Sequence, residues 1–318
     1  MGETTGIGWT DHTASPWWGC LKVSPGCEHC FAETLAVTRR KLPVWGPSST
    51  TERKRIASAI PNMVKWNKAA KRDGVRRKMF VASMCDVFES HPQVAPWRAE
   101  ALDVIAQCDG LDVQLLTKRP ENIRAMVPPA WLESWPAHVW VGTTVEDQRR
   151  ANERIPHLLN VPARVRFLSM EPLLESVDLT AAVAELFCMK CRAPVTISES
   201  GDPDDTSEGE RSRWVDPECP HACPDCGGET DGRYPNERIS WAIVGGESGP
   251  GARPFDIAWA RSIVKQCDDA GVPVFVKQCG DNPVIDGARV KFKAHHAADP
   301  SEWPADLQRQ EFPNGGAK

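Results

Sequence analysis

Residues 79–117 read MFVASMCDVFESHPQVAPWRAEALDVIAQCDGLDVQLLT and contain one complete strand–helix–strand unit. The runs Met79–Ser83 and Asp112–Thr117 are short, apolar and β-rich, which predicts two strands. Between them, Pro96–Cys108 has the apolar spacing of an amphipathic helix. Two strands joined by a helix predict a parallel βαβ unit.

The same alternation recurs along most of the chain. Further strands are predicted at His138–Thr143, Arg164–Met170, Ser240–Gly245 and Pro273–Lys277, with a shorter one at Thr13–Trp18. Further helices are predicted at Glu52–Arg72, Glu146–Leu159 and Ile257–Ala270. Six or seven such units predict an α/β fold with a full or partial (β/α) barrel, and a doubly wound open sheet is the alternative.

Composition narrows the classes of function. The 318 residues carry a net charge of −5, which argues against a protein that coats nucleic acid by bulk charge. No apolar run is long enough to span a bilayer, and the N-terminus lacks the pattern of a secretory signal, so we expect no membrane partner and a cytoplasmic location. Twelve cysteines in such a chain indicate metal ligands rather than disulfides.

Polar side chains follow each predicted strand. In a barrel these strand ends converge on one face, which predicts a shared binding site. The candidate residues are Ser83, Asp86, Lys118, Arg119, Glu171, Glu247, Ser248 and Lys277. An ion pair with one of the glutamates is the alternative role for Lys277.

Three cysteines near the N-terminus form the clearest constellation. Six residues separate Cys20 from Cys27, and two separate Cys27 from Cys30. Three thiolates on a four-iron cluster leave one iron open for a small molecule. The alternative is a structural zinc site completed by His29, His12 or a distant cysteine.

A second cysteine group lies in a stretch without strand–helix alternation. Two CxxC knuckles, Cys188/Cys191 and Cys223/Cys226, predict a small zinc-ribbon-like insertion at 186–237, and a second iron–sulfur cluster is the alternative. Cys219 or His221 is a candidate replacement ligand. The barrel is then formed by 1–185 and 238–318.

Several motifs together resemble an uncharacterised family of bacteriophage-encoded proteins with a three-cysteine motif, similar in layout to radical S-adenosylmethionine enzymes. They lie at 7–11, 19–33, 117–120, 166–174, 244–254 and 275–278, and include RFLSMEPLL and VGGESGPGARP. The resemblance implies an α/β barrel of the radical S-adenosylmethionine type and a 4Fe–4S cluster on Cys20, Cys27 and Cys30. It leaves the reaction and the catalytic residues open.

In such enzymes the open iron binds S-adenosylmethionine, and an electron donor drives its cleavage to a radical. The resemblance therefore implies that Ser83 and Asp86 hold the cofactor amine or ribose, that Lys118 and Arg119 face a carboxylate or phosphate, and that Glu171 and Glu247 accept hydrogen bonds. A nucleotide or nucleic acid is the expected substrate, and a phage-encoded chain would act in the host cytoplasm.

Three basic runs are candidate phosphate contacts, with solvated helix faces as the alternative: Arg39-Arg40-Lys41, Arg53-Lys54-Arg55 and 71–78. Two other functions remain open. One is a non-catalytic iron–sulfur and zinc protein that binds nucleic acid or protein. The other is a metal-dependent nuclease or hydrolase that uses Asp86, Glu171 and Glu247.

Overall fold

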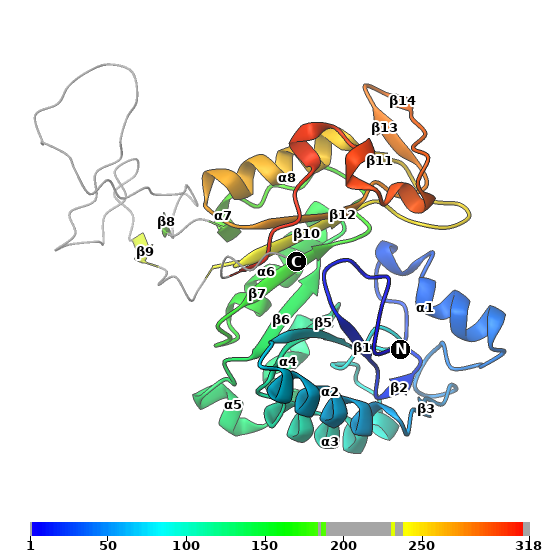
Figure 1. Ribbon diagram of the computed structural model, residues 1–318, viewed down its shortest axis with the longest axis vertical. Coiled ribbons are helices and arrows are strands. Elements are labelled where there is room, and N and C mark those ends of the chain that lie inside the picture. Colours follow the sequence, from blue (N-terminus) through cyan, green and yellow to red (C-terminus); the bar gives the residue numbers. More distant parts are fainter. Residues whose placement is uncertain (1, 184–185, 189–229, 233–237, 314–318) are drawn as a thin grey trace, which may run out of the picture.

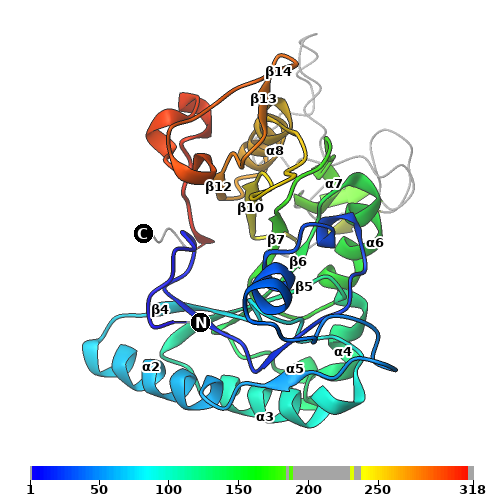
Figure 2. The ribbon, with the colours of Figure 1, turned by 90° about the vertical axis from the view of Figure 1, so that its right-hand side faces the viewer.

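The computed structural model describes residues 2–183, 186–188, 230–232 and 238–313. Its centre is a seven-stranded sheet in the order β1-β4-β5-β6-β7-β10-β12, and every neighbouring pair is parallel. The strands are β1 (His12–Ala14), β4 (Arg77–Val81), β5 (Leu111–Thr117), β6 (Val139–Thr144), β7 (Arg166–Met170), β10 (Trp241–Gly245) and β12 (Val274–Gln278). Because this order follows the chain without reversal, the sheet is a curled half-barrel and not a doubly wound sheet (Figures 1 and 2). The prediction of a partial barrel is confirmed.

Helices cover the outer face of the sheet. The long ones are α2 (Ala59–Asp73), α3 (Ala95–Ala106), α6 (Gln148–Leu159) and α8 (Ile257–Asp269). Figure 1 shows α2 and α3 along one side and α8 on the other. Shorter ones are α1 (Phe31–Glu33), α4 (Ile123–Met126), α5 (Pro129–Glu133) and α7 (Thr180–Val183). No helix in the described part of the chain is long and apolar enough to cross a bilayer.

The two faces of the sheet are packed by different residues, because successive side chains of a strand point to opposite sides. Aliphatic residues such as Val113 and Val141 face the helices. The inner face is aromatic and is centred on Trp241, whose ring centroid lies 5.7 Å from that of Phe167 and 6.0 Å from that of Trp140. The half-barrel is therefore filled with side chains and is not a channel.

The chain ends close the two open edges of this sheet. Gly2 forms a bridge to Thr13 beside β1, and Gln310 forms an antiparallel bridge to Phe275 beside β12. These segments also add Trp9 and Phe312 to the aromatic inner cluster. Covering the edge strands removes free backbone groups that otherwise pair with other chains.

Small sheets flank the half-barrel. Strands β11 (Phe255–Asp256), β13 (Pro283–Ile285) and β14 (Ala288–Arg289) form one of them, after the glycine-rich loop. In the predicted insertion, β8 (Leu186–Cys188) pairs antiparallel with β9 (Thr230–Gly232).

The zinc ligands fall in this insertion. Cys191, Cys223 and Cys226 lie outside the described residues, as do Cys219, His221 and the side chain of Cys188. The zinc site and the domain boundaries therefore stay predictions.

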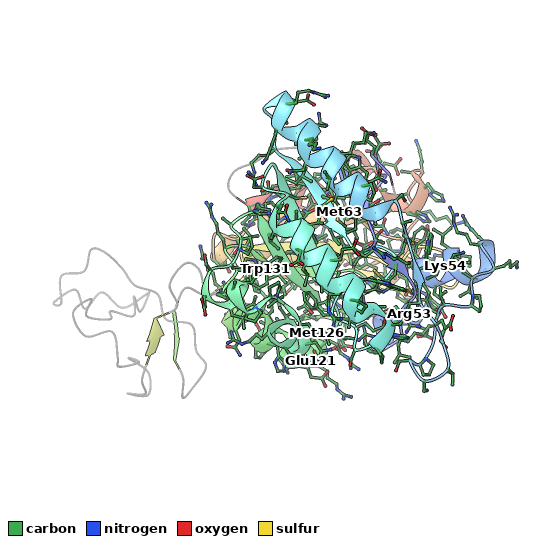
Figure 3. The ribbon with its side chains drawn as sticks, turned by 90° about the horizontal axis from the view of Figure 1, so that it is seen from below. Arg53, Lys54, Met63, Glu121, Met126 and Trp131 are labelled. Atoms are coloured by element: carbon green, nitrogen blue, oxygen red, sulfur yellow. The ribbon has the colours of Figure 1, made fainter. Side chains whose placement is uncertain are left out.

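Two predicted elements have different bounds. The predicted helix 52–72 begins only at Ala59, because Lys54–Arg55 form β3, which pairs with β2 (Trp17–Trp18). The predicted strand Thr13–Trp18 is accordingly divided between β1 and β2. Arg53, labelled in Figure 3, is buried, and its guanidinium group binds Glu89 at 2.6 Å. This buried ion pair holds 53–55 extended.

We expect Gly142→Ala to destabilise the protein, because a Cβ atom there would lie 2.6 Å from the Phe167 ring. Overpacking of this kind costs about 1–3 kcal/mol in free energy of unfolding, measured by urea denaturation. The control is Gly6→Ala, which meets open space and should change stability by less than about 0.5 kcal/mol. Equal unfolding midpoints for the two variants would contradict the packing described above.

Candidate functional site

A pocket of about 170 Å³ lies at the carboxyl ends of β4, β5 and β6. The loop between β2 and α1 supplies its three predicted cysteines, Cys20, Cys27 and Cys30. The strand ends supply Ser83, Cys85, Asp86, Lys118, Arg119 and Thr144. The structure thus brings together all three cysteines and four of the predicted strand-end residues.

Asp86 is held by protein donors on both carboxylate oxygens. Its Oδ1 accepts hydrogen bonds from Thr117 Oγ1 at 2.7 Å and Phe88 N at 3.0 Å. Its Oδ2 accepts from Lys118 N at 3.0 Å and from Arg119 Nη1 at 2.8 Å. With these partners, Asp86 organises the ends of β4 and β5 and has little capacity left for a ligand.

Arg119 connects these strand ends to the cysteine loop. Its Nη2 donates to the carbonyl of Leu21 at 2.7 Å, and its Nη1 lies 3.6 Å from Cys20 Sγ. The side chains of Asp86 and Arg119 are only 7 % and 8 % exposed. Because a buried charge is costly without a partner, this pair fixes the loop over the end of β5.

Two further carboxylates anchor the same loop. Glu146, fully buried after β6, binds Arg154 at 2.7 Å and accepts a hydrogen bond from Gly26 N at 3.3 Å. Glu247, after β10, binds His29 Nδ1 at 3.0 Å and Arg253 Nη2 at 2.5 Å. The cysteine loop is therefore attached to the ends of β5, β6 and β10.

Opposing effects act on the Glu247 carboxyl group. Burial alone would raise its pKa, but hydrogen bonds from the side chain and backbone of Arg253 and from His29 lower the pKa to about 2. Glu247 is therefore ionised at neutral pH, as an anchor for this loop requires.

Lys118 and Ser83 have few protein partners. Lys118 Nζ donates to Thr144 Oγ1 at 3.2 Å, and in the described ranges no carboxylate lies within ion-pair distance of it. Ser83 Oγ shares a hydrogen bond with Ser15 Oγ at 3.2 Å. A cation and hydroxyl groups beside the thiols are thus available to a bound molecule.

Burial disfavours the thiolate form of three of these cysteines. Burial, followed by the negative charge of Asp86, raises the pKa of Cys20 to about 12. Burial also raises the pKa of Cys30 and of Cys85. A bound metal would have to displace these protons, which is the usual course when thiols become metal ligands. Among the described residues, no group of three or more His, Cys, Asp or Glu side chains is gathered tightly enough to hold a metal ion as the chain stands.

The other predicted residues lie at the later strand ends, outside this pocket. Lys277 forms an ion pair with Glu171, which confirms the alternative role considered for it. Ser248 follows Glu247 and is half-buried. These residues extend the polar edge along β7, β10 and β12.

Sequence reasoning missed the anchoring roles of Glu146, Arg154, His29 and Arg253. Glu146 and Arg253 lie in polar segments just after predicted strands, which was their only local signal. Their partners depend on the path of the cysteine loop, which no local pattern encodes.

The basic runs are largely neutralised. Arg53 is buried with Glu89, and Arg55 pairs with Glu100. Four residues of the third run form ion pairs with aspartates: Lys71 with Asp109, Arg72 with Asp73, Arg76 with Asp112, and Arg77 with Asp73. The first run, Arg39-Arg40-Lys41, stays exposed, with Arg40 over the ring of Trp18 at 5.3 Å.

The fold and the site together define a partial parallel β/α barrel with a thiol-lined pocket at its strand ends. The chain belongs to the family described as "Protein of unknown function (DUF5131)", whose model matches residues 4–304. Neither a curated protein nor a solved structure matches the chain.

We expect Arg119→Met to destabilise the protein by about 3–5 kcal/mol, because it leaves Asp86 buried without a cation. Urea denaturation measures this loss, and the rate of Cys20 modification by a thiol reagent should rise as the loop is released. The control is Arg149→Met, which breaks an exposed pair with Glu153 and should cost less than about 0.5 kcal/mol. Similar losses in both variants would show that Arg119 does not anchor the loop.

Proposed function

We propose that this protein is a radical S-adenosylmethionine-like iron–sulfur enzyme that modifies a nucleotide or nucleic acid. The observation that carries the proposal is the pocket in which Cys20, Cys27 and Cys30 meet the cation of Lys118. Three thiols from one loop would supply three of the four ligands of a 4Fe–4S cluster and leave one iron open. The pocket lies at the carboxyl ends of parallel strands, which is where β/α barrels have their active sites.

When bound by Cys20, Cys27 and Cys30, a reduced cluster would supply the electron for cleavage of the sulfonium group of S-adenosylmethionine. The protein supplies binding, orientation and exclusion of water. In this proposal Lys118 would bind the cofactor carboxylate, and the hydroxyl groups of Ser83 and Thr144 would form hydrogen bonds with its amine or ribose. Asp86 and Arg119 act as positioning residues, because their hydrogen-bonding groups are already engaged.

The size of the pocket limits what it holds. Its volume of about 170 Å³ is below the roughly 300–1,000 Å³ of pockets that enclose drug-sized ligands. A pocket of this size would hold the cluster, and Glu171, Glu247 and Ser248 at the later strand ends would be the candidate contacts for the nucleoside part of S-adenosylmethionine. The exposed run Arg39-Arg40-Lys41 is the candidate contact for substrate phosphates.

The alternative is a non-catalytic iron–sulfur and zinc protein that binds nucleic acid or protein. It would use the same cysteine ligands, so only experiment distinguishes it from the enzyme. We do not propose a metal-dependent nuclease or hydrolase. Asp86, Glu171 and Glu247 are ion-paired to different cations, namely Arg119, Lys277 and Arg253. Carboxylates that hold divalent ions have to share one site.

Anaerobic purification tests the proposal. We expect about four irons and four sulfides per chain, and formation of 5′-deoxyadenosine after reduction in the presence of S-adenosylmethionine. Cys27→Ala should lose the iron, whereas Cys279→Ala, at a buried cysteine outside the pocket, should retain it. Zinc or no metal at this site in the wild-type protein would refute the proposal. A cluster that never binds S-adenosylmethionine would favour the non-catalytic binding protein.

A second experiment concerns the insertion. Cys223→Ser should release zinc from the purified protein, because it removes one of four predicted thiolate ligands, while the iron content stays unchanged. Metal analysis of both elements in the same sample measures this. Parallel loss of iron and zinc would contradict two independent metal sites.

A further inference from the structure

Four thiols, rather than three, line the pocket. The fourth belongs to Cys85, which follows β4, whereas the other three lie on the loop between β2 and α1. Four thiolates are the complete ligand set of a closed four-iron cluster.

The backbone places Cys85 beside the cysteine loop. Gly19 forms a parallel bridge with Cys85 and donates its N–H to the carbonyl of Met84 at 3.1 Å. This approach requires glycine, because at φ +114° a Cβ atom on residue 19 would lie 2.3 Å from the carbonyl oxygen of Val44. Cys20 and Cys85 therefore lie on adjacent backbone segments.

The turn after β4 is shaped to bring Cys85 there. Ala82 adopts φ +78°, a conformation that a residue with a Cβ rarely takes. The turn is closed by a hydrogen bond from Cys85 N to the carbonyl of Ala82 at 3.3 Å. Strained backbone of this kind persists where the surrounding structure imposes it, often at ligand sites.

The other candidates for a fourth ligand are engaged elsewhere. His29 binds Glu247 at 3.0 Å. His12 contacts the carbonyl of Glu3 and stacks on Trp66 of α2, on the helix side of the sheet. Cys279 is fully buried and does not line the pocket. In the described part of the chain, Cys85 is the remaining sulfur that lines this pocket together with the other three.

We propose that Cys85 is an exchangeable fourth ligand, which completes the sulfur set in the resting protein and gives way to the incoming molecule. This inference rests on the proposed function, since it concerns the group held by Cys20, Cys27 and Cys30. The exchange would be a substitution without electron transfer. The bond to the Cys85 sulfur would break, the amino nitrogen of the ligand would take its position, and the sulfur would take up the proton that the amino group releases.

Two measurable properties follow. A site closed by Cys85 keeps all its irons on mild oxidation, whereas an iron without a protein ligand is the first to leave. A ligand that has to displace Cys85 also binds more weakly than it would to an open site. Its apparent dissociation constant equals the constant for the open site divided by the fraction of protein in which the site is open.

The experiment compares wild type, Cys85→Ala, Cys85→Ser and the control Cys279→Ala, all purified without oxygen. Iron and sulfide content, electron paramagnetic resonance after mild oxidation, and equilibrium binding of S-adenosylmethionine to the unreduced protein are measured. We expect Cys85→Ala to convert to a three-iron cluster while wild type and Cys279→Ala keep their irons. Its affinity for S-adenosylmethionine should rise about tenfold over that of wild type.

Cys85→Ser separates the loss of sulfur from the loss of side-chain volume, and it should behave as Cys85→Ala does. Equal oxidation behaviour and equal affinity in wild type and both variants would overturn the assignment of Cys85 while the proposed function stands. Complete loss of iron in folded Cys85 variants would make Cys85 a permanent ligand and would overturn the exchange. A wild-type protein without iron would overturn both proposals.

Discussion

The buried ion pair between Asp86 and Arg119 is the interaction on which the candidate site depends. It joins the end of β4 to the end of β5, and through Arg119 it holds the backbone of Leu21 and the sulfur of Cys20. A charge taken out of water requires its partner, so neither strand end can shift independently. The cysteine loop thereby acquires a fixed position over the strand ends.

The same principle recurs at two other strand ends. Glu146 holds Gly26, and Glu247 holds His29, each together with an arginine that neutralises the carboxylate. Most acidic groups at this edge thus serve to position the cysteine loop. Lys118 is the contrasting case, because its ammonium group meets a hydroxyl and faces the thiols. An anionic group of a bound molecule is its natural partner.

The packing of the half-barrel explains why the site lies at its mouth. Trp241 and the aromatic rings around it pack against one another on the inner face. Gly142 is part of this packing, because the Phe167 ring occupies the position of its absent side chain. The thiol pocket opens only where the strands end and the loop crosses over them.

The sequence by itself determined the order of strands and helices, the parallel sheet, and the edge at which polar groups gather. These features depend on apolar periodicity among residues a few positions apart. Apart from the divided strand Thr13–Trp18, the observed strands agree with the predicted ones to within about two residues. It also identified Cys20, Cys27 and Cys30 through their spacing.

Only the tertiary structure decided which charge pairs with which, that Arg53 is buried, and that Cys85 joins the other three thiols. Gly26 and Glu146 are 120 positions apart in the chain, and His29 and Glu247 are 218 apart. Such contacts depend on how the sheet curls and where the loop crosses it. Local periodicity carries no information about either, because it describes one element at a time.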